Sequence, residues 1–160
     1  PAVGVGQACA TLVGKYLGKK NIEKSEQSMI EGLRGSFLIM GTMGIIFIFF
    51  PHLIVQIFTK DPEILYLAIK ILPWVGALQF VDVFAITLWF ALTGAGDTKF
   101  TAYVSIIVSW LVFVPLSYVL GIYYNLGIWG PWIAFGVYLF LEAILIIFRV
   151  NQGKWKHIKV

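Results

Sequence analysis

The sequence is poor in charge and in cysteine, and each shortage excludes a class of protein. Only 12% of its 160 residues are charged, whereas 59% are hydrophobic. A soluble domain carries roughly 25% charged residues, so this chain has too little charge to cover a soluble surface. It is also too apolar to be intrinsically disordered. Cys9 is the single cysteine, which excludes an internal disulfide and a multi-cysteine metal site. We therefore expect an integral membrane protein.

The motifs of soluble enzymes and nucleic-acid-binding modules are missing as well. Gly94–Lys99 lacks the Gly-Lys-Ser/Thr ending of a phosphate-binding loop. His52 and His157 are expected on opposite sides of the membrane, so a metal site shared by them is implausible. We expect no enzymatic activity, no cofactor, and no metal except a sodium ion at an acidic side chain.

Long apolar runs, by contrast, are abundant. A helix of about 20 apolar residues crosses a bilayer, and these runs are too long for the strands of a membrane barrel. The predicted fold class is an all-α membrane protein, a polytopic transmembrane helix bundle with one membrane domain at residues 1–160. Four complete spans and one partial span are expected, at residues 35–58, 64–92, 100–124, 131–150 and, for the partial span, 1–17. Because the chain starts with Pro1 inside an apolar run, we expect it to be the C-terminal piece of a longer protein.

The first linker, residues 18–34, is the only linker long enough to have its own structure. Asn21 is suited to cap a helix whose first turn holds Glu23. Apolar side chains recur on one face at helical spacing, at Ile22, Met29, Ile30 and Leu33. We predict a short amphipathic helix at the cytoplasmic membrane surface, with a solvated loop as the alternative.

The basic residues predict an orientation. Successive linkers must alternate sides of the membrane, and ten of the 12 basic residues fall on one side: Lys15, Lys19, Lys20, Lys24, Arg34, Lys99, Arg149, Lys154, Lys156 and Lys159. The positive-inside rule places this side, with the C-terminus, in the cytoplasm. The net charge of +4 is thereby explained without a nucleic-acid partner. The expected location is the plasma (inner) membrane.

Asp82 lies near the middle of the span at 64–92, too far from either end for its short side chain to reach the headgroups. A charged side chain at the bilayer centre costs about 2.5–3.5 kcal/mol, so such a residue usually has a function. Gln79, Trp89 and Thr93 occur at spacings that favour the same helical face as Asp82. The opposite face is apolar and suits lipid, with Phe80, Phe84 and Leu88.

This polar face is a candidate site for a coupling cation. A carboxylate in a low dielectric holds a proton more readily than in water, unless a cation replaces the proton. Asp82 is therefore expected to bind a proton or sodium, with Gln79 as its polar partner. Trp89 offers cation–π attraction to an organic cation, and Thr93 is a weaker candidate. In the alternative interpretation, Asp82 and Gln79 only hydrogen-bond to neighbouring helices.

Glu142, the second acid inside a span, is a weaker candidate for the site. It lies seven residues before Arg149 on the same helical face, about 10 Å along the axis. Tyr138, one turn earlier, is placed to hydrogen-bond to it. An ion pair with Arg149 explains Glu142 at least as well as a transport role. The preceding span carries a polar stripe that favours close helix packing, formed by Thr101, Ser105 and Ser109.

Four short stretches, taken in order, carry a family resemblance. The first is Thr11-Leu12-Val13-Gly14 with Leu17-Gly18 and Asn21, and the second is Phe58-Thr59-Lys60-Asp61. The third, Leu92-Thr93-Gly94-Ala95-Gly96-Asp97-Thr98-Lys99, is similar to a Leu-Arg-Gly-Ala-Gly-Asp-Thr signature with Thr93 in place of Arg. The fourth is Trp110 with Pro115-Leu116 and Gly127-Ile128-Trp129-Gly130. Their order and spacing resemble those of the multidrug and toxic compound extrusion (MATE) family over essentially the whole chain.

The resemblance implies twelve helices in two lobes of six, to which this chain contributes the end of the eighth helix through the twelfth. It implies a secondary transporter that exports organic cations and other drugs in exchange for sodium ions or protons. The acid that many members carry on the tenth helix corresponds to Asp82. The implied partners are a cationic, amphipathic small molecule, membrane lipid, and the N-terminal lobe of the same protein.

Two other functions are kept as alternatives. A lipid-linked oligosaccharide flippase of the same superfamily would line its cavity with basic residues, whereas these spans contain acids and almost no buried base. A non-transporting membrane assembly subunit would need a salt-bridge partner for Asp82 on another chain.

Overall fold

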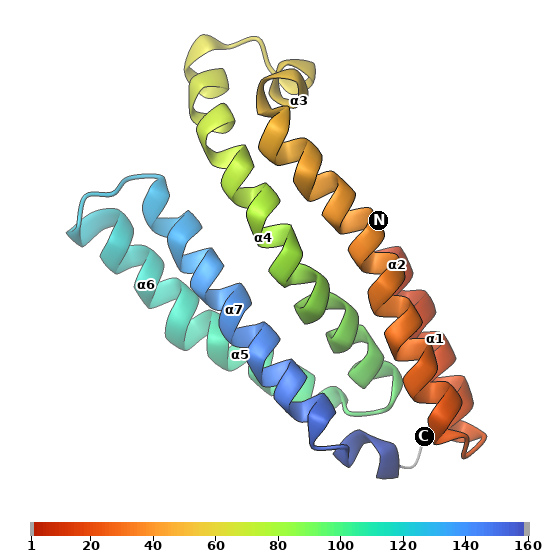
Figure 1. Ribbon diagram of the computed structural model, residues 1–160. Helices are drawn as coiled ribbons and strands as arrows, with labels where there is room; N and C mark the ends of the chain where they lie inside the picture. The colour runs from red at the N-terminus through yellow and green to blue at the C-terminus, as the bar shows by residue number, and fades with distance from the viewer. Residues whose placement is uncertain (1, 159–160) are drawn as a thin grey trace.

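The structure is a computed structural model that describes residues 2–158. Pro1 and Lys159, which were assigned above to the partial span and to the cytoplasmic bases, lie outside the described residues. The described chain consists of helices joined by short turns, with no strand among residues 2–158 (Figure 1). The expected all-α transmembrane bundle is thereby confirmed.

The first half of the chain forms three long helices and one short helix. These are α1 (Ala2–Gly18), α2 (Ile22–Phe49), α3 (Pro51–Phe58) and α4 (Pro62–Gly94). Helix α4 begins where the side chain of Asp61 accepts hydrogen bonds from the backbone amides of Glu63 and Ile64, which is the geometry of an N-cap. It then continues through Pro73 to its end at Gly94.

Helix α2 corrects the prediction for residues 18–34. Asn21 does cap a helix, because its side-chain oxygen accepts a hydrogen bond from the Lys24 backbone amide at 3.0 Å. That helix does not stop at the membrane surface but continues to Phe49. No proline lies between Asn21 and Pro51 to interrupt it, and the break comes only at Pro51, which lacks the amide needed to extend α2. The separate short helix expected within residues 18–34 is therefore the first part of the longer helix α2, whereas its place at the membrane surface stays a prediction.

The second half of the chain forms two long antiparallel helical segments and a short final turn. They comprise α5 (Thr98–Val108), the π-helical turn η1 (Ser109–Phe113), α6 (Val114–Tyr118), the π-helical turn η2 (Val119–Tyr123), α7 (Trp129–Asn151) and the 3-10 helix η3 (Lys154–His157). Pro115 lies at the start of α6, directly after η1. Local π adjustments of this kind re-satisfy backbone groups that a proline leaves without a partner in a membrane helix.

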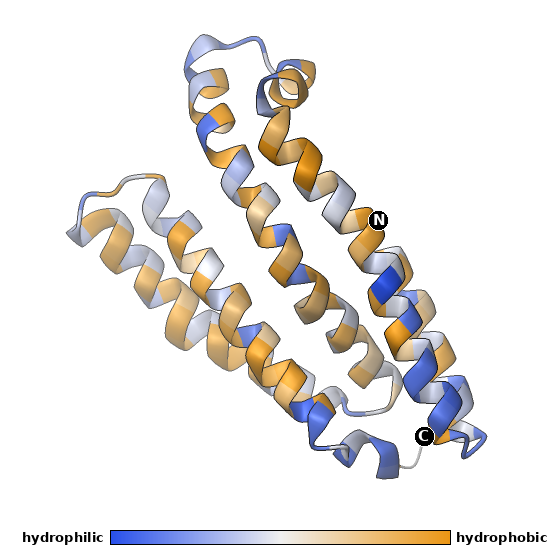
Figure 2. Cartoon of the chain, in the orientation of Figure 1, coloured by the Kyte–Doolittle hydropathy of each residue, from blue (hydrophilic) through white to orange (hydrophobic). Residues whose placement is uncertain are grey.

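Among residues 2–158, four segments are long and apolar enough to cross a membrane, namely Ile22–Phe49, Pro62–Gly94, Thr98–Tyr123 and Trp129–Asn151. The last three correspond to the spans expected at 64–92, 100–124 and 131–150. Apolar residues run along most of their length, whereas hydrophilic residues gather at the end of the bundle that holds the described C-terminus (Figure 2). This distribution is the one expected for helices whose middle lies in lipid.

Helix α4 is the central helix of the bundle, since it packs against α1 and α2 on one side and against α7 on the other. Two groups of helices result, α1–α2–α4 and α5–α6–α7, which lie closest at the C-terminal end and diverge toward the other (Figure 1). Two glycines allow α2 and α4 to touch. A Cβ atom on Gly44 would lie 2.7 Å from the carbonyl oxygen of Gly76, and a Cβ on Gly76 would lie 2.6 Å from that of Gly44. Small residues permit such close backbone approach between membrane helices.

The two groups are joined at one end by the turn after α7. Trp155 of η3 is only 1% exposed and belongs to a core cluster with residues of α1, α2, α4 and α7. Lys156 forms an ion pair with Glu26 at the start of α2. The α1–α2 turn and the described C-terminal residues therefore lie at the same end of the bundle, as the distribution of basic residues predicted.

Candidate functional site

Asp82 lies on α4 between two cavities. One, of about 340 Å³, opens between α4, α5 and α7, and the other, of about 250 Å³, opens between α1, α2 and α4. Asp82 lines both of them. The arrangement follows from the central position of α4, because a side chain on its surface meets a neighbouring helix on either flank. Asp82 therefore lies in packed protein beside space that a ligand can enter.

The larger of these two spaces, which we call the Asp82–Glu142 cavity, brings together side chains from three helices. Asp82 and Trp89 come from α4, seven residues or about two turns apart. Ser105 comes from α5, and Tyr138 and Glu142 come from α7. Apolar side chains complete the wall, namely Ala85, Ile86, Phe135 and Leu139. The cavity thus contains two carboxylic acids, a hydroxyl, a phenol and an indole in a largely apolar surround.

A chain of two hydrogen bonds connects three of these side chains. The indole Nε1–H of Trp89 donates to Ser105 Oγ at 3.2 Å. The hydroxyl of Ser105 donates to Glu142 Oε1 at 2.7 Å. Glu142 is 8% exposed, so it is buried, and its carboxylate is held in place by the hydrogen bond from Ser105 of α5. Ser105 was interpreted from the sequence as a packing residue, and its spacing within the polar stripe was the only sign of a further role.

The ion pair expected between Glu142 and Arg149 is wrong. Arg149 instead pairs with Asp97, with Nε 2.7 Å from Oδ2 and Nη2 3.2 Å from Oδ1. Its guanidinium also lies 4.7 Å from the centre of the Phe100 ring. Arg149 is near the end of α7, where the α4–α5 turn that carries Asp97 is the nearest neighbour. The partner is a residue 52 positions away in the sequence, which helical spacing alone does not reveal.

Gln79 and Trp89 lie on different flanks of α4. Gln79 lines the smaller cavity with side chains of α1 and α2, whereas Trp89 lines the Asp82–Glu142 cavity. At about 100° per residue, ten residues separate them by about 80° around the helix axis. Asp82 is between the two and faces both spaces. The single polar face expected from the sequence is therefore divided between two cavities.

The sequence also named Thr93 as a weaker site candidate and assigned Phe84 and Leu88 to a lipid-facing surface of α4. The Thr93 hydroxyl donates to the backbone oxygen of Trp89 at 2.8 Å and lies 3.5 Å from the Thr101 hydroxyl, near the end of the helix. Phe84 is exposed, as expected for a lipid-facing residue, but Leu88 is only 4% exposed and belongs to the core. The assignment of Leu88 to a lipid-facing surface is wrong because Leu88 packs in the core cluster with residues of α1, α2 and α7.

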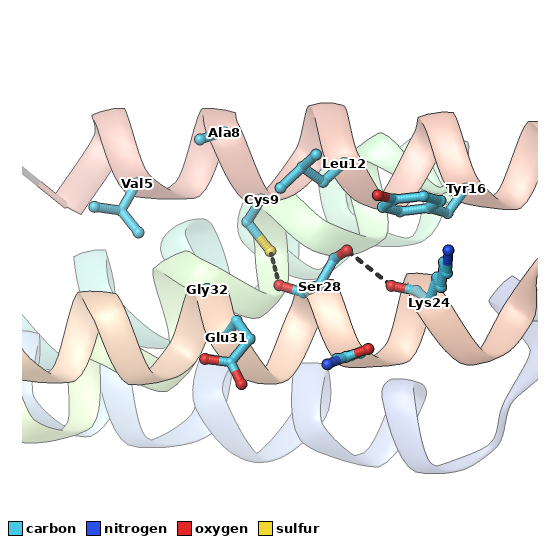
Figure 3. Close-up of a pocket in the computed structure, with 10 residues that line it drawn as sticks. Val5, Ala8, Cys9, Leu12, Tyr16, Lys24, Ser28, Glu31 and Gly32 are labelled. Carbon is cyan, nitrogen blue, oxygen red and sulfur yellow. Dashed lines mark hydrogen bonds between the residues drawn. The ribbon is translucent and has the colours of Figure 1, made fainter.

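A third cavity, of about 470 Å³, lies between α1 and α2 and was not expected from the sequence. Figure 3 shows Cys9, Ser28 and Glu31 on its wall, with the Cys9 thiol donating to the backbone oxygen of Ser28 at 3.6 Å. The Ser28 hydroxyl donates to the backbone oxygen of Lys24 at 2.8 Å. Glu31 pairs with Arg34 outside the cavity at 2.7 Å. The Cys9 bond joins α1 to α2, whereas the contacts of Ser28 and Glu31 lie within α2.

Within residues 2–158, no three side chains of His, Cys, Asp or Glu come together in the manner of a transition-metal site. The polar groups best placed for a ligand are those of the Asp82–Glu142 cavity. A buried carboxylate that faces such a space can take up a proton or a small cation, and the aromatic side chains of the wall can contact an organic cation.

Comparison of the chain with known proteins identifies its family. The model of the MatE family matches residues 1–119. A protein named probable multidrug resistance protein NorM, from Thermotoga maritima, is 32% identical over 156 residues, which cover 98% of this chain and 34% of that protein. A protein of the same name from Listeria monocytogenes is 31% identical over 147 residues, covering 91% of this chain and 32% of that protein. The chain thus spans about a third of the length of these relatives.

A solved structure shares the fold. The crystal structure of the eukaryotic MATE transporter AtDTX14 superposes with a TM-score of 0.85 at 21% sequence identity, covering 97% of this chain and 35% of that chain. The resemblance noted from the four sequence stretches is therefore confirmed by a family model over most of the chain, by the two relatives and by the helical arrangement. The chain belongs to the MatE family of multi-pass membrane transporters.

Proposed function

We propose that this chain is part of a secondary transporter that exports organic cations or other drugs in exchange for sodium ions or protons, and that Asp82 binds the coupling ion. The observation that carries the proposal is the position of Asp82, on a membrane-spanning helix and at the wall of two cavities. The names of the relatives, as probable multidrug resistance proteins, support the substrate class.

The neighbours of Asp82 have separate roles in this proposal. Trp89 contributes an aromatic wall on the α7 side, where an organic cation would gain cation–π attraction. Gln79 contributes an amide on the α2 side, where it can complete the coordination of a small cation at Asp82. Because Asp82 faces both spaces, one carboxylate can serve the substrate and the coupling ion in turn. Such alternate use is what exchange transport requires.

The proposal concerns the full-length protein. The chain covers about a third of the length of its relatives, and alternating access needs a second half to form the opposite wall of the cavity. An N-terminal lobe of the same protein is the proposed partner. The basic end of the bundle is proposed to lie in the cytoplasm of a cell whose plasma membrane holds the transporter.

The test is D82N in the full-length protein, reconstituted in vesicles with an imposed sodium or proton gradient. Asn keeps the size of the side chain but cannot carry the charge, so we expect gradient-driven efflux of a fluorescent organic cation such as ethidium to be lost. D61N is the matched control, since Asn also serves as an N-cap and Asp61 lies at the start of the same helix. Efflux that survives in D82N with its gradient dependence unchanged would refute the role of Asp82.

A further inference from the structure

We propose that Glu142 is a second proton-binding group of the Asp82 site, positioned by Ser105 and Trp89. This inference rests on the proposed function, because it assigns to the same transport site a second carboxylate on a different helix. Three features of the structure support it: the shared cavity, the direction of the hydrogen bonds at Glu142, and the way in which the nearest base on α7 is engaged.

The shared cavity places Glu142 where its charge affects the site. Glu142 on α7 and Asp82 on α4 both line the Asp82–Glu142 cavity. Among the described residues, the only other titratable side chain on that wall is Tyr138, while α5 contributes Ser105. Two carboxylates that share one small space of low dielectric do not both carry their charge without cost, so their protons are coupled. A cation that enters the cavity therefore competes with protons on both acids.

The direction of the hydrogen bonds identifies which carboxylate oxygen is engaged. An indole N–H can only donate, so Ser105 Oγ must accept from Trp89. The Ser105 hydroxyl hydrogen is then free to point to Glu142 Oε1, which accepts it at 2.7 Å. The hydrogen bond from Ser105 therefore engages one oxygen of the Glu142 carboxylate and holds the side chain in place. Trp89 ends the chain without a titratable group, so protons exchange with the cavity and are not passed along Ser105.

The basic side chain closest along α7 does not neutralise Glu142. Arg149 is instead engaged with Asp97, to which it donates two hydrogen bonds. Among residues 2–158, no lysine, arginine or histidine nitrogen lies within 4.0 Å of the Glu142 carboxylate. No basic side chain of the described residues therefore neutralises the Glu142 carboxylate, and its one printed hydrogen bond comes from Ser105. The carboxylate is thus left available to a proton or a cation from the cavity.

The first experiment counts protons. Purified full-length protein in sodium-free, weakly buffered detergent solution is titrated with tetraphenylphosphonium, and the protons released on binding are measured with a pH indicator. We expect the wild type to release protons from both acids and E142Q to release about half as many per bound cation. E63Q, the same change at the exposed first turn of α4, should match the wild type. Equal release from E142Q and the wild type, or no release from the wild type between pH 5 and 8, overturns the proposal.

The second experiment separates positioning from simple structural support and does not require Glu142 to be altered. S105A removes the hydrogen bond that favours the charged carboxylate, so the midpoint of proton release should move to higher pH, by about one to two units. S117A is the matched control, because the Ser117 hydroxyl is buried on the same helical segment without a hydrogen-bond partner among the described residues. A merely structural Ser105 would lower the yield of folded protein but leave the midpoint unchanged. An unchanged midpoint in S105A therefore refutes the positioning role.

The two proposals fail in different ways. If D82N leaves both efflux and proton release unchanged, the proposed function is wrong, and the role of Glu142 in it falls as well. If D82N abolishes coupled efflux while E142Q keeps the full number of released protons, only the inference about Glu142 is wrong. If E142Q lowers proton release but D82N does not, the proton site is on α7 and Asp82 has been misassigned.

Discussion

Two buried acids at the α7 interface, Asp97 and Glu142, have opposite surroundings. Asp97 meets the guanidinium of Arg149 through both oxygens, and the side chains of the pair are 7% and 18% exposed. Glu142, two turns earlier on α7, receives a hydroxyl hydrogen bond and faces a cavity. Both are buried, so burial alone does not distinguish a structural acid from a functional one. The distinction lies in whether the charge is neutralised within the protein or left available to a ligand.

The largest effect should come from breaking the neutralised pair. D97A leaves the partly exposed Arg149 guanidinium without its carboxylate partner, which costs about 1.5–3 kcal/mol in the free energy of unfolding, as for hydrogen bonds to charged groups. The measurement is thermal unfolding of the full-length protein in detergent, compared with the wild type. A D97A protein that unfolds at the wild-type temperature would show that the Asp97–Arg149 pair does not stabilise the fold.

The same measurement on E142Q sharpens the contrast. Gln keeps an oxygen that can accept from Ser105 and removes a buried charge, so the free energy of unfolding should change by only about 1 kcal/mol in either direction. Proton release, by contrast, should fall as described above. If E142Q destabilises the protein as much as D97A does, Glu142 is a structural acid like Asp97, and the distinction drawn between the two acids is wrong.

The smallest effect is expected at the outer end of the hydrogen-bond chain. W89F keeps the aromatic wall but loses the indole donor, and a single hydrogen bond contributes about 0.5–1.5 kcal/mol. The midpoint of proton release should move in the same direction as in S105A, and by less, because Trp89 acts on Glu142 only through Ser105. A shift in W89F larger than that in S105A would mean that Trp89 influences the acid by another route.

The sequence predicted the features that depend on position along one helix. The length of the apolar runs indicated α4, the α5–η2 segment and α7 as spans, and Asn21 indicated the start of α2. Asp82 was recognised because a charge far from both ends of a span is costly wherever the neighbouring helices lie. The prediction of a break after residue 34 failed because a change from charged to apolar side chains does not end a helix, and α2 has no proline before Pro51.

Features that depend on how helices are rotated against each other were not predictable. Leu88 is buried and Gln79 is separated from Trp89 because of where α1, α2 and α7 pack around α4. The partner of Arg149 and the contact from Ser105 to Glu142 each join residues on different helices. A single sequence indicates the angle between two side chains on one helix but not which neighbour each of them faces.

The burial of Trp155 has a consequence for how this part of the protein is completed during synthesis. The core cluster that contains Cys9 and Leu92 also contains Trp155, which is made after all the spans described here. Until Trp155 arrives, α1, α2, α4 and α7 have a gap at the end where the two helix groups meet. Trp155 can therefore enter the cluster only after α7 has been made. A fusion partner joined directly after His157 would interfere with that step, whereas a long flexible spacer would permit it.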